Sequence, residues 1–74
     1  MRGWTPSGAL ATNVEITSGS VQRGDVIQIG GQPCRIVDLI QLPAGAKRLR
    51  FESGEQLTMH ARTRLVALRM RRHW

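Results

Sequence analysis

The sequence has few of the residues that build covalent, metal or base-stacking sites. Its 74 residues include one cysteine, two histidines, three aromatic side chains and no tyrosine. A single cysteine, Cys34, excludes an internal disulfide and fits a reducing compartment, so we expect a cytoplasmic protein. Cys34, His60 and His73 stand far apart in the chain, whereas zinc ligands are closely spaced, so no metal site is predicted.

Long apolar runs are also missing. None approaches the roughly 20 residues that a membrane-spanning helix needs. The segment that opens the chain, MRGWTPSGALATN, has no continuous apolar core, which a signal peptide requires. The sequence therefore predicts no membrane partner.

The patterns that usually mark an enzyme are absent as well. Glu52 and Glu55 flank a predicted hairpin tip, where both carboxylates would be solvated rather than paired for acid–base work. The glycines at 30 and 31 suit a turn, because no helix follows them as it would in a phosphate-binding loop. Cys34 falls on an apolar face, as a small core residue does. We expect neither catalysis nor a cofactor.

Positive charge, in contrast, is abundant and unevenly placed. The formal net charge is +6, with three arginines and three carboxylates in residues 1–46, and eight cations against two carboxylates in residues 47–74. Such a basic region attracts polyanions, including nucleic acid. The same cluster is consistent with a solvated face that keeps the protein soluble, and the arginine bias is consistent with a GC-rich genome.

Strands are predicted from Val21 onward. Asp25–Ile29 ends at Gly30–Gly31, a pair that suits a two-residue hairpin loop and would place Ile27 opposite Cys34. Residues 34–42 are apolar on both alternations, which is typical of a long, bent barrel strand that buries parts of both faces.

A second hairpin follows from the alternation in residues 47–52 and 56–60. Because a one-residue slip moves every side chain to the other face, the apolar pattern favours a three-residue loop, Ser53–Glu55. The predicted core pairs are Phe51 with Leu57 and Leu49 with Met59. The predicted outer pairs are Arg48 with His60, Arg50 with Thr58, and Glu52 with Gln56.

The ends of the chain are less regular. Residues 1–12 mix Gly, Pro, Ser and Ala without a period and predict a flexible arm, with a short strand expected at 14–17, inside a domain of residues 13–70. Residues 61–64 suit a 3₁₀ turn before a last strand, Leu65–Met70, and a basic tail at 71–74. A helix over 61–74 is the alternative, since Ala, Leu, Met and Arg favour helices.

Together these elements predict an all-β fold, a small five-stranded SH3-like barrel. The stretch GDVIQIGGQPCRIVDL resembles the N-terminal barrel of bacterial elongation factor P and, more loosely, KOW-type barrels of ribosomal and transcription proteins. The resemblance covers residues 21–52 and lies in Gly24, the strand 26–29, the turn 31–33 and the strand 36–38. It implies the barrel fold and RNA-rich partners.

The chain departs from that family at one informative place. Elongation factor P has a lysine at the tip of the loop after the second strand, whereas this loop reads Leu42-Pro-Ala-Gly-Ala46, and Lys47 already belongs to the next strand. These 74 residues are also too few to include the two further barrels of the factor. The resemblance therefore does not imply a role in peptidyl transfer.

The basic third of the chain supplies the predicted nucleic-acid-binding residues. Arginines two positions apart on a strand project to the same side and can follow a line of phosphates. The candidates are Lys47, Arg48, Arg50, His60, Arg62, Arg64, Arg69, Arg71 and Arg72. We expect contacts to the DNA or RNA backbone, since exposed aromatics for base stacking are scarce.

Two further functions are compatible with the sequence. The domain is alternatively a protein-interaction or oligomerisation module that docks an acidic partner, or a homodimer, with Val37, Leu39 and Leu65 as the apolar contacts. A third possibility is an accessory barrel with no recognisable task. An arginine surface on one continuous face would favour nucleic acid over both.

Overall fold

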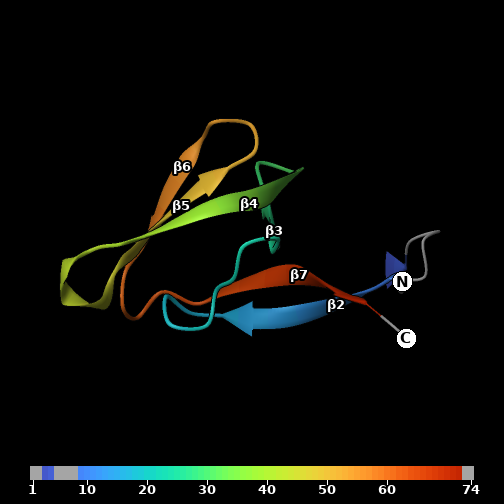
Figure 1. Cartoon of the computed structure of the whole chain (residues 1–74), viewed down its shortest axis with the longest axis horizontal. Coiled ribbons are helices and arrows are strands. Elements are labelled where there is room, and N and C mark those ends of the chain that lie inside the picture. Colours follow the sequence, from blue (N-terminus) through green and yellow to red (C-terminus); the bar gives the residue numbers. More distant parts are fainter. Residues whose placement is uncertain (1–2, 5–8, 73–74) are drawn as a thin grey trace.

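Strands make up almost all of the regular structure (Figure 1). The structure is a computed structural model, and it describes residues 3–4 and 9–72. The strands are β1 (Gly3–Trp4), β2 (Ala9–Ile16), β3 (Val26–Ile29), β4 (Gln32–Gln41), β5 (Lys47–Phe51), β6 (Gln56–Met59) and β7 (Leu65–Arg72). One 3₁₀ turn, η1 (Pro43–Gly45), connects β4 to β5. In this described part, no helix has the length and apolar character needed to cross a membrane.

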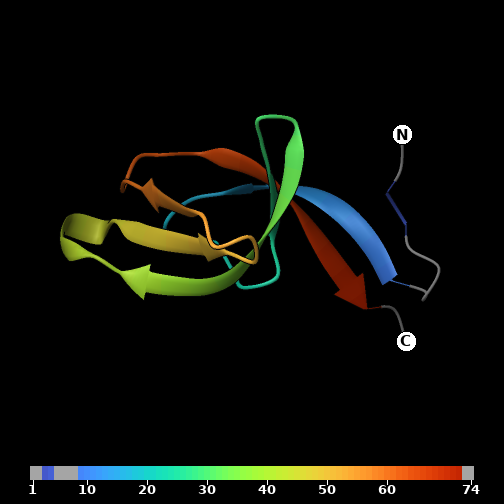
Figure 2. The same ribbon diagram turned by 90° about the horizontal axis from the view of Figure 1, so that it is seen from above.

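Six strands form one antiparallel sheet in the order β2-β7-β3-β4-β5-β6, and the two-residue β1 adds to the β2 edge. The sheet is not closed into a barrel, and it has six strands rather than the predicted five. β7 pairs with β2 along its whole length but with β3 only through Val26 and Leu68. The β2–β7 ribbon therefore extends away from the other strands, as Figures 1 and 2 show.

The first hairpin confirms the predicted register. Ile27 lies opposite Cys34, and the loop is the pair Gly30–Gly31. Both glycines have positive φ angles, 58° and 80°, which is the backbone that a two-residue hairpin loop of this kind requires.

A β-bulge explains why β4 is apolar on both alternations. The pairing of β4 with β5 shifts between Ile36 and Asp38, so Val37 is an extra residue. Ile36 is buried before the bulge, and Leu39 faces the buried Leu49 after it. The inward side thus changes from even to odd positions along one strand, and Val37 itself is 44% exposed.

The second hairpin has the predicted faces but a different register. Leu49 pairs with Leu57, and the loop is residues 52–54, closed by a bond from the Phe51 N–H to the Glu55 carbonyl (2.9 Å). The predicted pairs, both inner and outer, are therefore wrong by two residues. Gly54 has a φ of 93°, and a three-residue loop favours glycine at its left-handed last position. A two-residue shift keeps every side chain on its face, so the apolar pattern could not detect the error.

The segments that flank the domain also differ from expectation. β2 begins at Ala9, so the last four residues of the predicted arm form a strand. Residues 61–62 form a single hydrogen-bonded turn, from the Thr63 N–H to the His60 carbonyl (3.0 Å), and the 3₁₀ turn lies instead at η1. The final strand is confirmed over the helical alternative and continues to Arg72, while His73 and Trp74 lie outside the described residues.

The core is small and lies between the two halves of the bent sheet. Its buried apolar residues are Ile16, Val21, Ile27, Cys34, Ile36, Leu49, Phe51, Met59 and Ala67. Cys34 is thus a core residue, as predicted. The loops are tied together by a hydrogen bond from the Ser18 hydroxyl to the Gly45 carbonyl (2.6 Å), which anchors η1 to the turn after β2.

Candidate nucleic-acid interface

β5 presents two arginines on the outer face of the sheet. Its sequence alternates Arg48, Leu49, Arg50 and Phe51, and the two apolar residues are buried while both arginines are exposed. Successive side chains of a strand point to opposite faces, so burial of one set forces the other outward. The core therefore fixes the direction of these two cations.

A tight turn beside η1 adds two further arginines. The turn between β6 and β7 is closed in both directions, because the His60 N–H donates to the Thr63 hydroxyl oxygen (3.1 Å) and the Thr63 N–H donates to the His60 carbonyl. Arg62 and Arg64 are exposed on it, as is His60. A Cβ added to Gly45 would lie 3.4 Å from the Ala61 Cβ, so the turn packs directly against η1.

Carboxylates are scarce around these four arginines. Residues 39–51 and 56–65 contain none, and the loop between them has two, Glu52 and Glu55, at its exposed tip. The nearest cross-strand carboxylate is Asp38, which lies opposite Arg50, and its Oδ1 accepts the N–H of Leu39 (2.9 Å). Asp38 and Arg50 form no ion pair. None of the four arginines forms an ion pair within residues 3–4 and 9–72, and we call Arg48, Arg50, Arg62 and Arg64 the free arginines.

Lys47 faces the other way. It shares the inner face of β5 with Leu49 and lies opposite Met59, so its side chain is half-buried at the rim of the core. The structure therefore separates Lys47 from the arginines that follow it in the sequence.

Arg69 differs from the free arginines because its guanidinium is bound to a buried carboxylate. Nε and Nη2 each donate to one carboxylate oxygen of Asp25 (both 2.9 Å), and Nη2 also donates to the Ser20 carbonyl (3.1 Å). Asp25 is only 1% exposed and further accepts the Gln22 N–H (2.9 Å). The hydrogen bond to Asp25 raises the pKa of Arg69 above its usual value, although burial acts in the opposite direction. Arg69 is a structural cation.

Arg71 and Arg72 occupy the last two positions of β7, opposite Leu10 and Ala9. Of the nine predicted residues, the structure thus places Arg48 and Arg50 on one face of β5 and His60, Arg62 and Arg64 on the adjoining turn. It assigns Lys47 to the inner rim and Arg69 to an ion pair.

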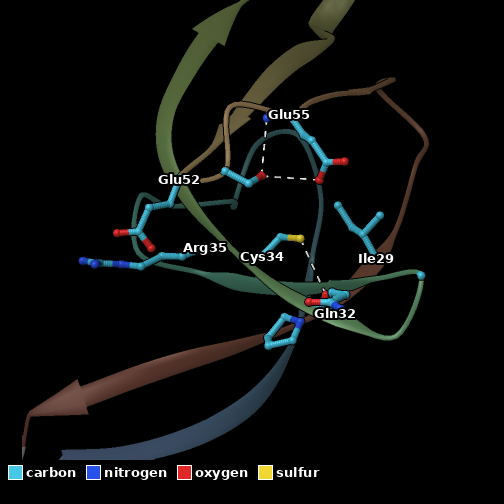
Figure 3. A pocket seen from close by; sticks show the side chains of 9 residues that line it. Ile29, Gln32, Cys34, Arg35, Glu52 and Glu55 are labelled. Carbon is cyan, nitrogen blue, oxygen red and sulfur yellow. Dashed lines mark hydrogen bonds between the residues drawn. The ribbon is translucent and has the colours of Figure 1, made fainter.

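A groove between the β3–β4 hairpin and the 52–55 loop contains Cys34 (Figure 3). The Cys34 thiol donates to the Gln32 carbonyl (3.6 Å), and Ser53 hydrogen-bonds to Glu55 across the loop. Glu52 and Glu55 outnumber Arg35 in the lining, so this groove disfavours anions. Within residues 3–4 and 9–72, no three His, Cys, Asp or Glu side chains gather into a metal site.

Two arginines that the sequence analysis passed over line a second groove. Arg23 and Arg35 lie in the half of the chain whose charges sum to zero, which gave no reason to select them. The sequence signal that could have revealed the arrangement is Asp25, which directly follows Gly24 and precedes an apolar strand. An aspartate at the start of an apolar strand needs a buried partner, and here that partner is the distant Arg69.

Comparisons of the chain with protein-family models, with curated proteins and with solved structures give no match.

Proposed function

We propose that the protein binds nucleic acid without catalysis, through contacts between the free arginines and backbone phosphates. One observation supports this proposal above the others: Arg48, Arg50, Arg62 and Arg64 are all exposed, and the segments that contain them have no carboxylate. One guanidinium group can donate two parallel hydrogen bonds to two oxygens of a phosphate. Each cation that neutralises a phosphate also releases counterions from the nucleic acid. Clustering of the free arginines favours a polyanion partner. Solubility alone would not require clustering, because dispersed charges would provide it equally well.

The choice of backbone over base contacts follows from the aromatic residues. Phe51, the one phenylalanine, is 2% exposed and belongs to the core. The side chains that the structure describes therefore offer no exposed aromatic for base stacking, which disfavours a single-stranded site. A duplex or structured RNA presents a regular array of phosphates and fits exposed arginines better.

We further propose that β3 to β7 form an open version of an SH3-like barrel. They comprise a first hairpin, a long bent second strand and a short turn before the last strand, in the order that the resemblance to elongation factor P implies. β2 then acts as an added strand on β7. A nucleic-acid partner and the buried thiol of Cys34 both agree with a cytoplasmic location.

Fluorescence anisotropy with labelled duplex DNA, single-stranded DNA and structured RNA tests this function. Four phosphate contacts imply a slope of log Kobs against log salt of about −3.6, or about 100-fold weaker binding at 200 mM than at 50 mM salt. We expect the single strand to bind most weakly. No binding to any of the three at 50 mM salt would refute the proposal.

The double variant Arg48→Gln/Arg50→Gln localises the interface. It should reduce the slope by about 2, because each lost phosphate contact changes it by about 1. Lys47→Gln is the matched control, since Lys47 is on the opposite face of the same strand and should change the slope by much less. Because the control removes one charge and the double variant removes two, a change half as large in Lys47→Gln would show that only net charge matters.

A docking site for a protein is the second candidate, and the outer face of β7 favours it. Val66 is 64% exposed and Met70 is 43% exposed on the same side of the strand. Of the predicted apolar contacts, Val37 is exposed, whereas Leu39 and Leu65 pack against the core. A Val66→Ser/Met70→Ser variant that keeps full nucleic-acid binding would show that this face acts separately from the free arginines.

A further inference from the structure

The second groove lies where β7 continues past β3. The two strands share only the bridge between Val26 and Leu68. On that edge, the next residues of β7 run beside the 22–25 loop, while the other edge stays paired with β2. The space between them is about 510 Å³, within the range of about 300 to 1,000 Å³ typical of small-molecule sites. Its lining consists of Gln22, Arg23, Gly24, Asp25, Val26, Arg35, Arg69 and Met70.

The charge of this lining is strongly positive. Three arginines stand against one carboxylate, Asp25, which gives a net charge of +2. The carboxylate is 1% exposed and bound to Arg69, so it is shielded from a ligand in the groove. Arg23 and Arg35 are exposed and form no ion pair within the described part of the chain.

Arg69 retains donors that can serve a ligand. A guanidinium has five N–H donors. Nε uses its single donor on Asp25, and Nη2 uses both of its donors on Asp25 and Ser20. The two donors of Nη1 have no partner among the described residues. Because the buried carboxylate already holds the guanidinium in place, binding would cost little side-chain entropy.

We propose that this groove binds a phosphate monoester of nucleotide size. A monoester has a charge between −1.5 and −2 near pH 7, which matches the net charge of the lining, whereas a backbone diester has a single charge. Val26 and Met70 supply an apolar wall for the organic part of the ligand. The site uses none of the free arginines, so it adds a second activity to the proposed backbone contacts.

The neighbouring groove shows why the choice of lining matters. Arg35 lines both grooves, but on the other side it stands beside Glu52, and Figure 3 shows the two side chains extending in the same direction. With Glu55 included, that groove has a net charge of −1. A phosphate should therefore select the side of Arg35 that faces Arg23 and Arg69.

A titration followed by ¹H–¹⁵N NMR tests the proposal. The probes are a nucleoside 5′-monophosphate and the same nucleoside without phosphate. We expect saturable shifts at the amides of residues 22–26, 35, 69 and 70 with the monophosphate and none with the nucleoside. Equal binding of both probes, or shifts confined to residues 47–50 and 60–64, would overturn it.

The double variant Arg23→Gln/Arg35→Gln should weaken monophosphate binding at least tenfold, while its ¹H–¹⁵N spectrum remains that of a folded protein. Arg62→Gln/Arg64→Gln, which removes the same charge elsewhere, should leave it unchanged. Similar losses in both variants would show that net charge, and not a defined binding site, holds the monophosphate.

Competition experiments identify the source of the phosphate group. A 5′-phosphorylated duplex that competes with the monophosphate, while a 5′-hydroxyl duplex does not, would identify a strand end as the source. Competition by neither would indicate the free nucleotide.

Failure of this proposal can be distinguished from failure of the proposed function. The groove is tested with a mononucleotide at residues 22–35 and 69–70, and the interface is tested by salt-dependent duplex binding at residues 48–64. A protein that binds duplex but no mononucleotide would refute only the groove.

Discussion

Two aspartates lie beside arginines in this sheet, and the two pairs behave differently. Asp25 is 1% exposed and holds Arg69 through two hydrogen bonds of 2.9 Å. Asp38 lies directly opposite Arg50 on the outer face of β4 and β5, yet the two form no ion pair. A buried carboxylate must find a partner, whereas Asp38 is only half-buried and its Oδ1 already accepts the Leu39 N–H, so it gains less from pairing. Burial, rather than adjacency, therefore decides which arginine is structural and which is free.

Removing the buried carboxylate should have the largest effect on stability. Asp25→Asn leaves the guanidinium of Arg69 without its anion, and because that side chain is 26% exposed and partly solvated, we expect a loss of about 2 kcal/mol, as for hydrogen bonds to charged groups. Urea denaturation measures the change in the free energy of unfolding. Asp38→Asn is the matched control and should stay within about 0.5 kcal/mol of the wild type. Equal losses at the two sites would remove the distinction between them.

Arg69→Lys should have a smaller effect. The lysine keeps the positive charge but cannot form two parallel bonds to Asp25 or reach Ser20 in the same geometry, so we expect a loss of about 1.5 kcal/mol. The measurement is again urea denaturation. Arg50→Lys, in contrast, should leave the free energy of unfolding unchanged, and a comparable loss there would mean that Arg50 is also held by the fold.

The effect of Asp38→Asn on duplex binding tests the difference between the two aspartates a second way. Removing this carboxylate frees Arg50 from an opposing charge, which is worth about 0.5 kcal/mol between solvated groups, or about twofold tighter duplex binding at low salt. Anisotropy titration at 50 mM salt measures this gain, which should vanish in an Arg50→Gln background. A gain that persists there would assign the effect to net charge alone.

The sequence predicted local pairing better than distant pairing. The register of the first hairpin was correct because Gly30–Gly31 allows only one short loop. The second hairpin was shifted by two residues because alternation is blind to even shifts, although Gly54 would have indicated the right loop. The prediction of a closed barrel was wrong. Whether the sheet closes depends on which strands pair with the two edges of β7. That is a contact between the two ends of the chain, which no local pattern encodes.

Charge was misjudged for a related reason. Counting along the chain made residues 1–46 neutral, so Arg23 and Arg35 were passed over. In the fold, Asp25 neutralises Arg69, which is 44 residues away. Arg23 and Arg35 form no ion pair among the described residues, and the pairing removes one candidate from the basic third. Arg48, Arg50, Arg62 and Arg64 were predicted correctly as exposed cations because strand alternation and a short turn are local features.

The salt dependence of duplex binding tests the central claim most directly. The slope of log Kobs against log salt is to be measured for the wild type and for the variant with all four free arginines changed to glutamine. We predict a slope of about −3.6 for the wild type and nearly zero for the variant. A variant that folds and keeps the wild-type slope would contradict the account, because the phosphates would then be bound elsewhere.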